Sequence, residues 1–220
     1  MENLLFILSL LISTIPLFSQ DQDKEVVGDE PYPAPVMYHN LSLQEAKLIK
    51  QFESKDVSNL HIYADVKQDG DYFFKGKPLD ADFSEFFSGD LEEQTKIKGQ
   101  EPQAVFSIRG EAKELYIIRT LGNGSGHEIA LYELDNGKLQ KYLPLASYQC
   151  QDGKCTQLDS WIQDINGDTR LDIIQVAKLT GKNGKEKISS KVYLMDQEGH
   201  LIKSKNTKID LDDYPMQSLW

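Results

Sequence analysis

Residues 164–172 read D-I-N-G-D-T-R-L-D, which places three carboxylates and one carboxamide at positions one, three, five and nine. A hard cation such as Ca²⁺ takes roughly six to eight oxygen ligands at about 2.3–2.6 Å, and a tight acidic loop can supply them. A glycine at position four, Gly167, would permit the sharp turn that brings these oxygens together. The spacing predicts a calcium site. The side chains of Asp164, Asn166, Asp168 and Asp172 would bind the ion, and Arg170 would add its backbone carbonyl.

The residues on either side of this loop favour β-strands. An EF-hand would need a helix on each side and a bidentate Glu at position twelve, where this chain has Gln175. Residues 171–176 are rich in β-branched types, and residues 157–163 also have a strand-like pattern. The sequence therefore predicts strand, acidic loop, strand.

With these flanking strands, the loop resembles the calcium-carrying repeats of the FG-GAP and VCBS type. The resemblance lies in D-x-N-G-D-x-x-x-D followed by Leu171, Ile173 and Ile174, and it covers about one repeat, residues 159–203. The family usually has glycine at position six, where this chain has Thr169. The alternative interpretation is an acidic surface hairpin that binds no metal.

The C-terminal half of the chain repeats a strand pattern. Residues 115–120 match 171–176, and residues 130–139 match 191–201. Such antiparallel units stack into propellers, so we expect a mainly β fold with blade-like repeat units and a small N-terminal α+β portion. Two units are too few to close a propeller, so we expect either that the N-terminal segment caps the sheet or that the chain pairs with another chain. In the first unit the positions that correspond to the ligands hold Ile108, Gly110, Ala112 and Tyr116, which cannot replace the carboxylates. A single metal site is therefore predicted, in the second unit.

Four segments are expected along the chain. Residues 1–19 contain the apolar run 4–18 and predict a secretion signal, with an uncleaved membrane anchor as the alternative. Residues 20–35 are acidic and proline-rich, as in a flexible leader. Residues 36–103 form the α+β segment, and residues 104–220 the β-repeat domain with the calcium loop.

Local patterns within residues 36–103 predict individual elements. S-L-Q-E at residues 42–45 has the form of a capping box and predicts a helix start. Strands are expected at 60–64 and 72–75, and a short helix at 82–87. Residues 89–101 are highly charged and are expected to be exposed.

Charge and cysteine content narrow the compartment and the partners. The formal net charge is −11, which disfavours binding to nucleic acid and to anionic membranes. Cys150 and Cys155 lie on either side of a turn centred on Gly153, and in an exported protein this spacing predicts a local disulfide. Neighbouring ligands for a zinc site are missing, and a redox motif is more often C-x-x-C. We therefore expect a secreted or periplasmic protein without stable membrane insertion.

Other constellations have simpler structural explanations. The glycine-rich segment 122–126 lacks the Lys and Ser/Thr of a phosphate loop and aligns with a hairpin, and His127-Glu128 lacks the second histidine of H-E-x-x-H. The acidic and aromatic residues between 63 and 87 are expected to form turns and core. No catalytic set is recognisable. We expect a calcium-binding module for a protein or glycan, with a secreted hydrolase that uses carboxylates of residues 65–82 as the alternative.

Overall fold

The computed structural model describes residues 41–65, 72–97, 100–109, 113–121 and 127–219. The expected signal and leader, residues 1–35, lie outside the described residues, and so does most of the first-unit loop at 110–112. Pro33–Trp220 forms one compact unit. The segments 36–103 and 104–220 therefore pack together in a single body.

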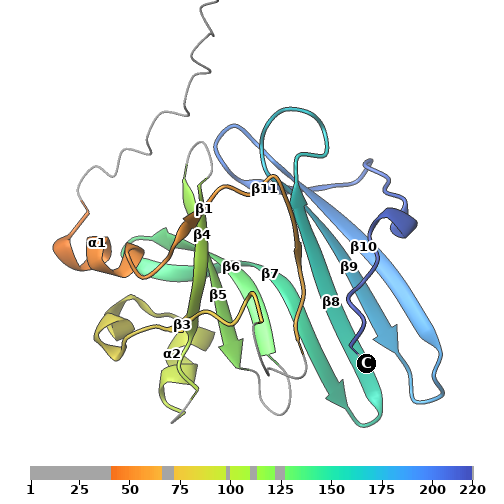
Figure 1. The fold of residues 1–220 in the computed structure, drawn as a ribbon, viewed down its shortest axis with the longest axis horizontal. Helices are drawn as coiled ribbons and strands as arrows, with labels where there is room; N and C mark the ends of the chain where they lie inside the picture. The colour runs from red at the N-terminus through yellow and green to blue at the C-terminus, as the bar shows by residue number, and fades with distance from the viewer. Residues whose placement is uncertain (1–40, 66–71, 98–99, 110–112, 122–126, 220) are drawn as a thin grey trace, which may run out of the picture. The chain divides into compact units, whose positions relative to one another are not determined.

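A large mixed β-sheet dominates this unit (Figure 1). Its strands lie side by side in the order β1 (Ser54–Lys55), β4 (Gln103–Arg109), β5 (Glu114–Leu121), β6 (His127–Asp135), β7 (Lys138–Gln151), β8 (Lys154–Gln163), β9 (Asp172–Thr180), β10 (Glu186–Met195) and β11 (Leu201–Ser204). Two short strands, β2 (Asn59–Ile62) and β3 (Lys77–Pro78), pair with β8 and β4. β1 and β4 are parallel, and the other pairs named here are antiparallel.

Two-residue turns determine the register of the central hairpins. Asn136 and Gly137 join β6 to β7, and Asp152 and Gly153 join β7 to β8, all four with φ between 48° and 75°. Left-handed conformations at both positions are characteristic of the hairpin turn that Asn-Gly and Asp-Gly favour. The second turn brings Cys150 directly opposite Cys155, and the two form the expected disulfide.

The expectation of a mainly β fold with some helix is confirmed, whereas a propeller-like closure is not seen among the described residues. β5–β6–β7 and β9–β10–β11 are two antiparallel meanders at the matched segments. The long strand β7 pairs with β6 through its first part and with β8 through its last part. Both meanders therefore belong to one continuous sheet, and this sheet is not closed.

Short helices of the N-terminal segment cover one face of β4–β7, as expected if this segment covers the sheet. They are α1 (Leu43–Ile49), the 3₁₀ helix η1 (Ala81–Phe86) and α2 (Asp90–Thr95). The predicted capping box begins α1, since Ser42 Oγ accepts the N–H of Glu45 and the Glu45 carboxylate accepts the N–H of Ser42. The buried residues of this face include Leu48, Phe83, Phe86, Leu91, Tyr116, Ile118 and Tyr132.

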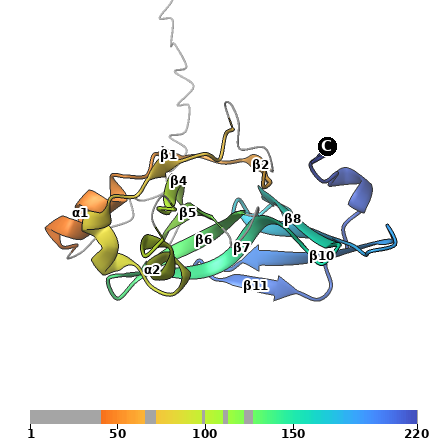
Figure 2. The ribbon, with the colours of Figure 1, turned by 90° about the horizontal axis from the view of Figure 1, so that it is seen from below.

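Two further cores lie on the sheet, one on each face of β8–β10. The larger one joins side chains from both halves of the sheet, including Phe106, Ile117, Ile129, Ile162, Ile173 and Met195. The smaller one lies on the opposite face of β8–β10, where the C-terminal segment with η2 (Leu211–Asp213) packs against the strands (Figure 2). Trp161 is its largest buried side chain, and Tyr214 packs on it.

Three local expectations differ from the structure. Residues 72–75 form a turn, closed by a hydrogen bond from Lys75 N to Tyr72 O, because the buried side chains of Tyr72 and Phe74 pack into the larger core. Residues 89–101 contain α2, whose Leu91 is fully buried. A glutamate side chain is usually exposed, but Glu114 on β5 is 8% exposed and accepts a hydrogen bond from Ser107.

Candidate functional site

The loop between β8 and β9 makes the sharp turn that its sequence predicted. Gly167 has φ +77° and Thr169 has φ +68°. Glycine adopts this conformation freely, whereas a β-branched residue rarely does. Thr169 is held there by two hydrogen bonds, from its N–H to Asp164 Oδ2 at 2.8 Å and from its Oγ1 to the carbonyl of Asp168 at 2.6 Å. Local bonding thus accommodates a threonine at the position where glycine is usual.

Asp164 places its carboxylate on the inside of this turn. Oδ1 accepts the N–H groups of Gly167 at 2.7 Å and Asp168 at 3.2 Å, and Oδ2 accepts that of Thr169. These hydrogen bonds, with that from Thr169 the strongest influence, hold the pKa of Asp164 below its usual value. Asp164 is therefore a carboxylate at neutral pH. Each of its oxygens has lone pairs beyond those that the backbone uses.

Asp168 and Asn166 face each other in the same turn. Asn166 Oδ1 accepts the N–H of Asp168 at 3.0 Å, and its Nδ2 donates to Asp168 Oδ2 at 3.0 Å. Asp168 Oδ1 accepts the N–H of Arg170 at 2.9 Å, and the Arg170 guanidinium lies 3.4 Å from Asp168 Oδ2. The Arg170 side chain, which the sequence did not implicate, thus partly neutralises one expected ligand.

Asp172 differs from the other acidic residues because its side chain is fully buried. Oδ2 accepts the N–H of Ile165 at 3.1 Å, and Oδ1 accepts the N–H of Met195 at 2.9 Å. Burial raises the pKa of Asp172, and the negative charges of Asp168 and Asp164 raise it further. Asp172 ties the loop to the end of β10, and it lies close enough to the other two carboxylates to be repelled by them.

The structure brings the predicted ligands to one side of the loop without gathering them around a point. Among the described residues, the group whose ligand atoms lie within 4.8 Å of one another is Asp196, Glu198 and His200, not the loop carboxylates. The loop oxygens point instead at backbone N–H groups. The five predicted ligands therefore share one loop, and their carboxylates also serve as hydrogen-bond acceptors of that loop.

The turn between β10 and β11 is an acidic feature that sequence analysis missed. Asp196 accepts the N–H of His200 at 2.7 Å, and its other oxygen lies 3.5 Å from the His200 ring. The first of these hydrogen bonds holds the pKa of Asp196 below its usual value. The spacing D-x-E-x-H was visible in the sequence, but His200 was treated there as an isolated histidine. This turn begins directly after Met195, the residue that Asp172 contacts.

A second polar network, also missed, lies under the C-terminal segment. Asp159 is fully buried on β8, and its Oδ2 accepts the N–H of Gln217 at 2.7 Å and lies 3.0 Å from His61 Nε2. Gln157 donates to Asp159 Oδ1 at 3.1 Å and to the carbonyl of Gln217 at 2.9 Å. The His61 ring stacks on Trp161 at 4.2 Å. This network holds the C-terminal segment on the sheet.

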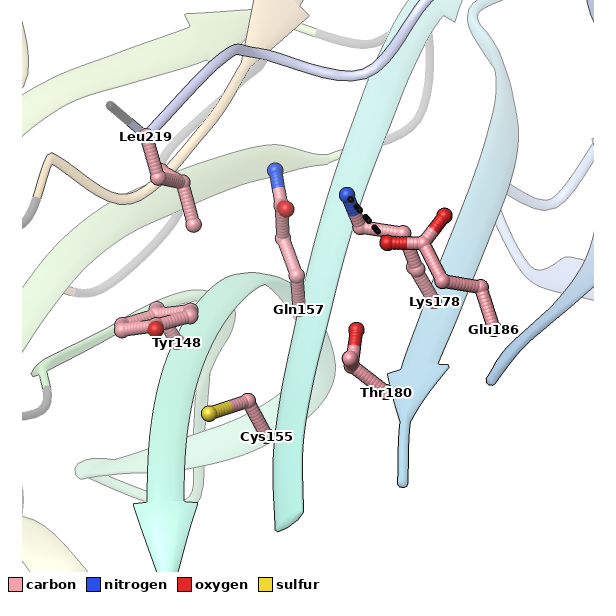
Figure 3. A pocket seen from close by; sticks show the side chains of 7 residues that line it. All are labelled: Tyr148, Cys155, Gln157, Lys178, Thr180, Glu186 and Leu219. Atoms are coloured by element: carbon pink, nitrogen blue, oxygen red, sulfur yellow. Dashed lines mark ion pairs between the residues drawn. The ribbon is translucent and has the colours of Figure 1, made fainter. Parts of the chain in front are cut away.

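A small cavity of about 120 Å³ lies next to this network (Figure 3). The side chains of Tyr148, Gln157 and Leu219 face it on one side, and the ion pair of Lys178 with Glu186, 3.7 Å apart, lies on the other. The cavity is large enough for only a few water molecules, and its titratable side chains are already paired with each other. It offers no room for a substrate.

The acidic and aromatic residues between 63 and 87 do not form a catalytic site in the described part of the chain. Asp80 accepts the N–H of Asp82 and begins η1. Asp65, Asp80 and Asp82 line neither the cavity beside the Asp159 network nor the one beside α2 (Asp90–Thr95). Five of the aromatic side chains are buried, namely Tyr72, Phe74, Phe83, Phe86 and Phe87. Asp69 and Asp71, which belong to the same expected group of carboxylates, lie outside the described residues, so the hydrolase alternative stays a prediction.

His127 provides a measurable pH dependence. It is 3% exposed at the start of β6, and burial, helped by the charge of Arg119, lowers its pKa to about 4. An unfolded histidine takes up a proton below a pH of about 6.5. Between these values the unfolded state binds more protons, so the contribution of His127 to stability is present above pH 6.5 and is lost as the pH falls towards 4. We expect a loss of up to about 3 kcal/mol in the free energy of unfolding.

The measurement is denaturant unfolding of the wild type and of His127→Gln at several pH values between 4 and 7. Carboxyl groups also titrate in this range, so the quantity of interest is the difference in free energy of unfolding between the two proteins. The wild type should lose more stability than His127→Gln as the pH falls from about 6.5 towards 4. Parallel pH profiles would contradict the assignment.

No helix in the part of the chain that the structure describes is long and apolar enough to cross a membrane.

Comparisons with known proteins add no family or relative. The chain matches no protein-family model, no curated protein and no solved structure. The resemblance of residues 164–172 to calcium-carrying repeats therefore depends on the residues of this loop alone.

Proposed function

We propose that this chain is an exported β-rich protein that binds Ca²⁺ in the loop 164–172 and serves as a binding or structural module for a protein or glycan. One observation carries the proposal. Asp164, Asp168 and Asp172 each accept a backbone N–H of the same nine-residue loop, so three carboxylates lie within one short segment. Three negative charges in so small a space repel one another, and a bound cation relieves that repulsion.

The donor set favours a hard cation. The expected ligands are carboxylate, amide and carbonyl oxygens, which suit Ca²⁺ better than a transition metal that prefers nitrogen or sulfur. The Arg170 guanidinium competes with the ion for Asp168, because it lies 3.4 Å from Oδ2. An affinity on the order of micromolar to millimolar, as in other extracellular modules, is consistent with this competition.

Export is supported by two features of the chain. Residues 4–18 form an apolar run of the length found in secretion signals. The disulfide between Cys150 and Cys155 is of a kind that persists in oxidising compartments. The net charge of −11 favours protein or glycan partners over nucleic acid.

Calcium should raise the melting temperature of the wild-type protein. At a free concentration about 100-fold above Kd, binding to the folded state alone would add about 2.7 kcal/mol. For a chain of this size that corresponds to roughly 5–10 °C. The measurement is thermal unfolding with calcium and with chelator.

Asp168→Asn and Asp56→Asn form a matched pair of variants for this test. Both remove one negative charge, but Asp56 is an exposed residue outside the loop. We expect Asp56→Asn to keep the calcium effect and Asp168→Asn to lose most of it. Asp168→Asn should match or exceed the stability of the wild type in chelator, because it removes repulsion in the empty loop. A wild-type midpoint that calcium does not change would overturn the proposal.

A further inference from the structure

A cavity of about 220 Å³ lies between α2 and strands β5, β6 and β7, on the sheet face that carries the helices. It is separate from the calcium loop and from the network around Asp159. Six of the side chains that line it are polar or charged, namely Asp90, Glu93, Gln94, Thr120, Glu128 and Lys141. Three of these are carboxylates and one is an ammonium group, so the cavity is acidic.

One cation of the protein is already fixed at the cavity wall. Lys141 Nζ donates to Asp90 Oδ2 at 2.9 Å and also to Glu128. Burial alone would lower the pKa of Lys141, but the hydrogen bonds to Glu128 and Asp90 outweigh it and raise that pKa. The buried hydroxyl of Tyr132 adds a hydrogen bond to Asp90 at 3.3 Å. Asp90 and Glu128 are thus held rigidly, and each has further lone pairs free to accept hydrogen bonds.

Gln94 provides the observation that points to a ligand. Its side chain is 7% exposed, and its Nε2 donates to the carbonyl of Leu121. Its Oε1 is buried and has no hydrogen-bond partner among the described residues. A buried amide oxygen without a donor costs about 1–3 kcal/mol, so such atoms are uncommon without a functional reason. A ligand that donates an N–H to Gln94 would remove this cost.

The chemistry of the wall selects the class of ligand. Glu93 and Gln94 offer acceptors, Asp90 and Glu128 have spare lone pairs, and Ile97 adds an apolar side chain that is 42% exposed. A compact metal ion is less suitable, because it would have to displace the Lys141 ammonium that already donates to Asp90 and Glu128. An extended organic cation can span these acceptors and place its alkyl part against Ile97.

We propose that the cavity between α2 and β5–β7 binds a guanidinium or primary ammonium group carried on an aliphatic chain. The cation donates N–H groups to Gln94 Oε1 and to the carboxylates of Glu93 and Glu128. This group can come from a free polyamine-like molecule or from an arginine or lysine side chain of a partner protein.

Thermal unfolding of the full chain with agmatine, in the presence of chelator, tests the proposal. At about ten times its Kd, agmatine should raise Tm by about 4 °C. Hexamethonium is also a dication on an aliphatic chain but has no N–H donors, and it should have little effect. Equal stabilisation by both salts, or no shift with agmatine, would overturn the proposal.

Three variants separate the cavity from general charge effects. Gln94→Met keeps the side-chain size and removes the acceptor, and Glu128→Gln removes one carboxylate. Glu92→Gln is the matched control, because Glu92 lies on the same helix and is exposed outside the cavity. Both cavity variants should weaken agmatine binding about tenfold by calorimetry, whereas Glu92→Gln should bind as the wild type does. Glu128→Gln also releases Lys141, so Gln94→Met provides the test if the former fails to fold. Unchanged affinity in Gln94→Met would contradict the proposed contact.

The source of the cation is distinguished with two further probes, putrescine and a blocked arginine with both peptide ends capped. Both carry the required group, but only the second presents it beside a peptide backbone. Tighter binding of blocked arginine than of agmatine identifies a partner side chain as the natural ligand. The reverse order identifies a free amine.

Discussion

Asp159→Ala is expected to lower the free energy of unfolding by about 4 kcal/mol. The carboxylate is fully buried and accepts hydrogen bonds from Gln217 N and Gln157 Nε2, with His61 at 3.0 Å. Alanine would leave these donors without their acceptor in an environment that excludes water, and each such loss costs about 1–3 kcal/mol. The C-terminal segment should then come away from the sheet, which limited proteolysis can detect.

Two comparisons define what this result means. His61→Phe keeps a ring to stack on Trp161 and removes only one contact of Asp159, so we expect a loss of about 1 kcal/mol. Asp56→Ala, at an exposed position, should change stability by less than about 0.5 kcal/mol. If Asp159→Ala lost no more than His61→Phe, the carboxylate would not hold the C-terminal segment.

Asp172→Ala is expected to cost about 4 kcal/mol in chelator, and more with calcium, because the loop then also loses a proposed ligand. Its two oxygens accept the N–H groups of Ile165 and Met195, so alanine would leave two backbone donors unsatisfied beside the sheet. Asp172→Asn should cost less, because one oxygen remains as an acceptor and the repulsion from Asp164 and Asp168 disappears. Denaturant unfolding of both variants in both conditions is the measurement.

This expectation refines the test of the calcium site. The Asp172 carboxylate stabilises the fold with or without calcium, whereas Asp168 forms hydrogen bonds only within its own turn. A large cost at Asp172 in chelator that increases with calcium, together with an effect at Asp168 that depends on calcium, would support both roles. An equal, calcium-independent cost at both residues would indicate that the loop carboxylates are structural acceptors only.

Features that depend on neighbours in the chain were predictable from the sequence. The capping box at residues 42–45, the two-residue turns at Asn136-Gly137 and Asp152-Gly153, and the disulfide across the second turn all involve residues within a few positions of one another. Their geometry follows from local conformational preference. The strands on either side of the loop 164–172 were predictable for the same reason, because alternation and β-branched residues act over short distances.

Features that depend on distant residues were decided by the tertiary structure. Asp159 and Gln217 are 58 positions apart, and nothing in the pattern of either segment indicates that they meet. The bend of β7 from β6 to β8 joined the two expected units into one continuous sheet, because a strand of 14 residues can pair with different neighbours along its length. Residues 89–101 were expected to be solvent-exposed for their charge, yet burial of Leu91 and Gln94 anchors α2 and forms the acidic cavity beside it. Sequence composition determined which groups were available for chemistry, and long-range packing determined which of them were brought together and removed from water.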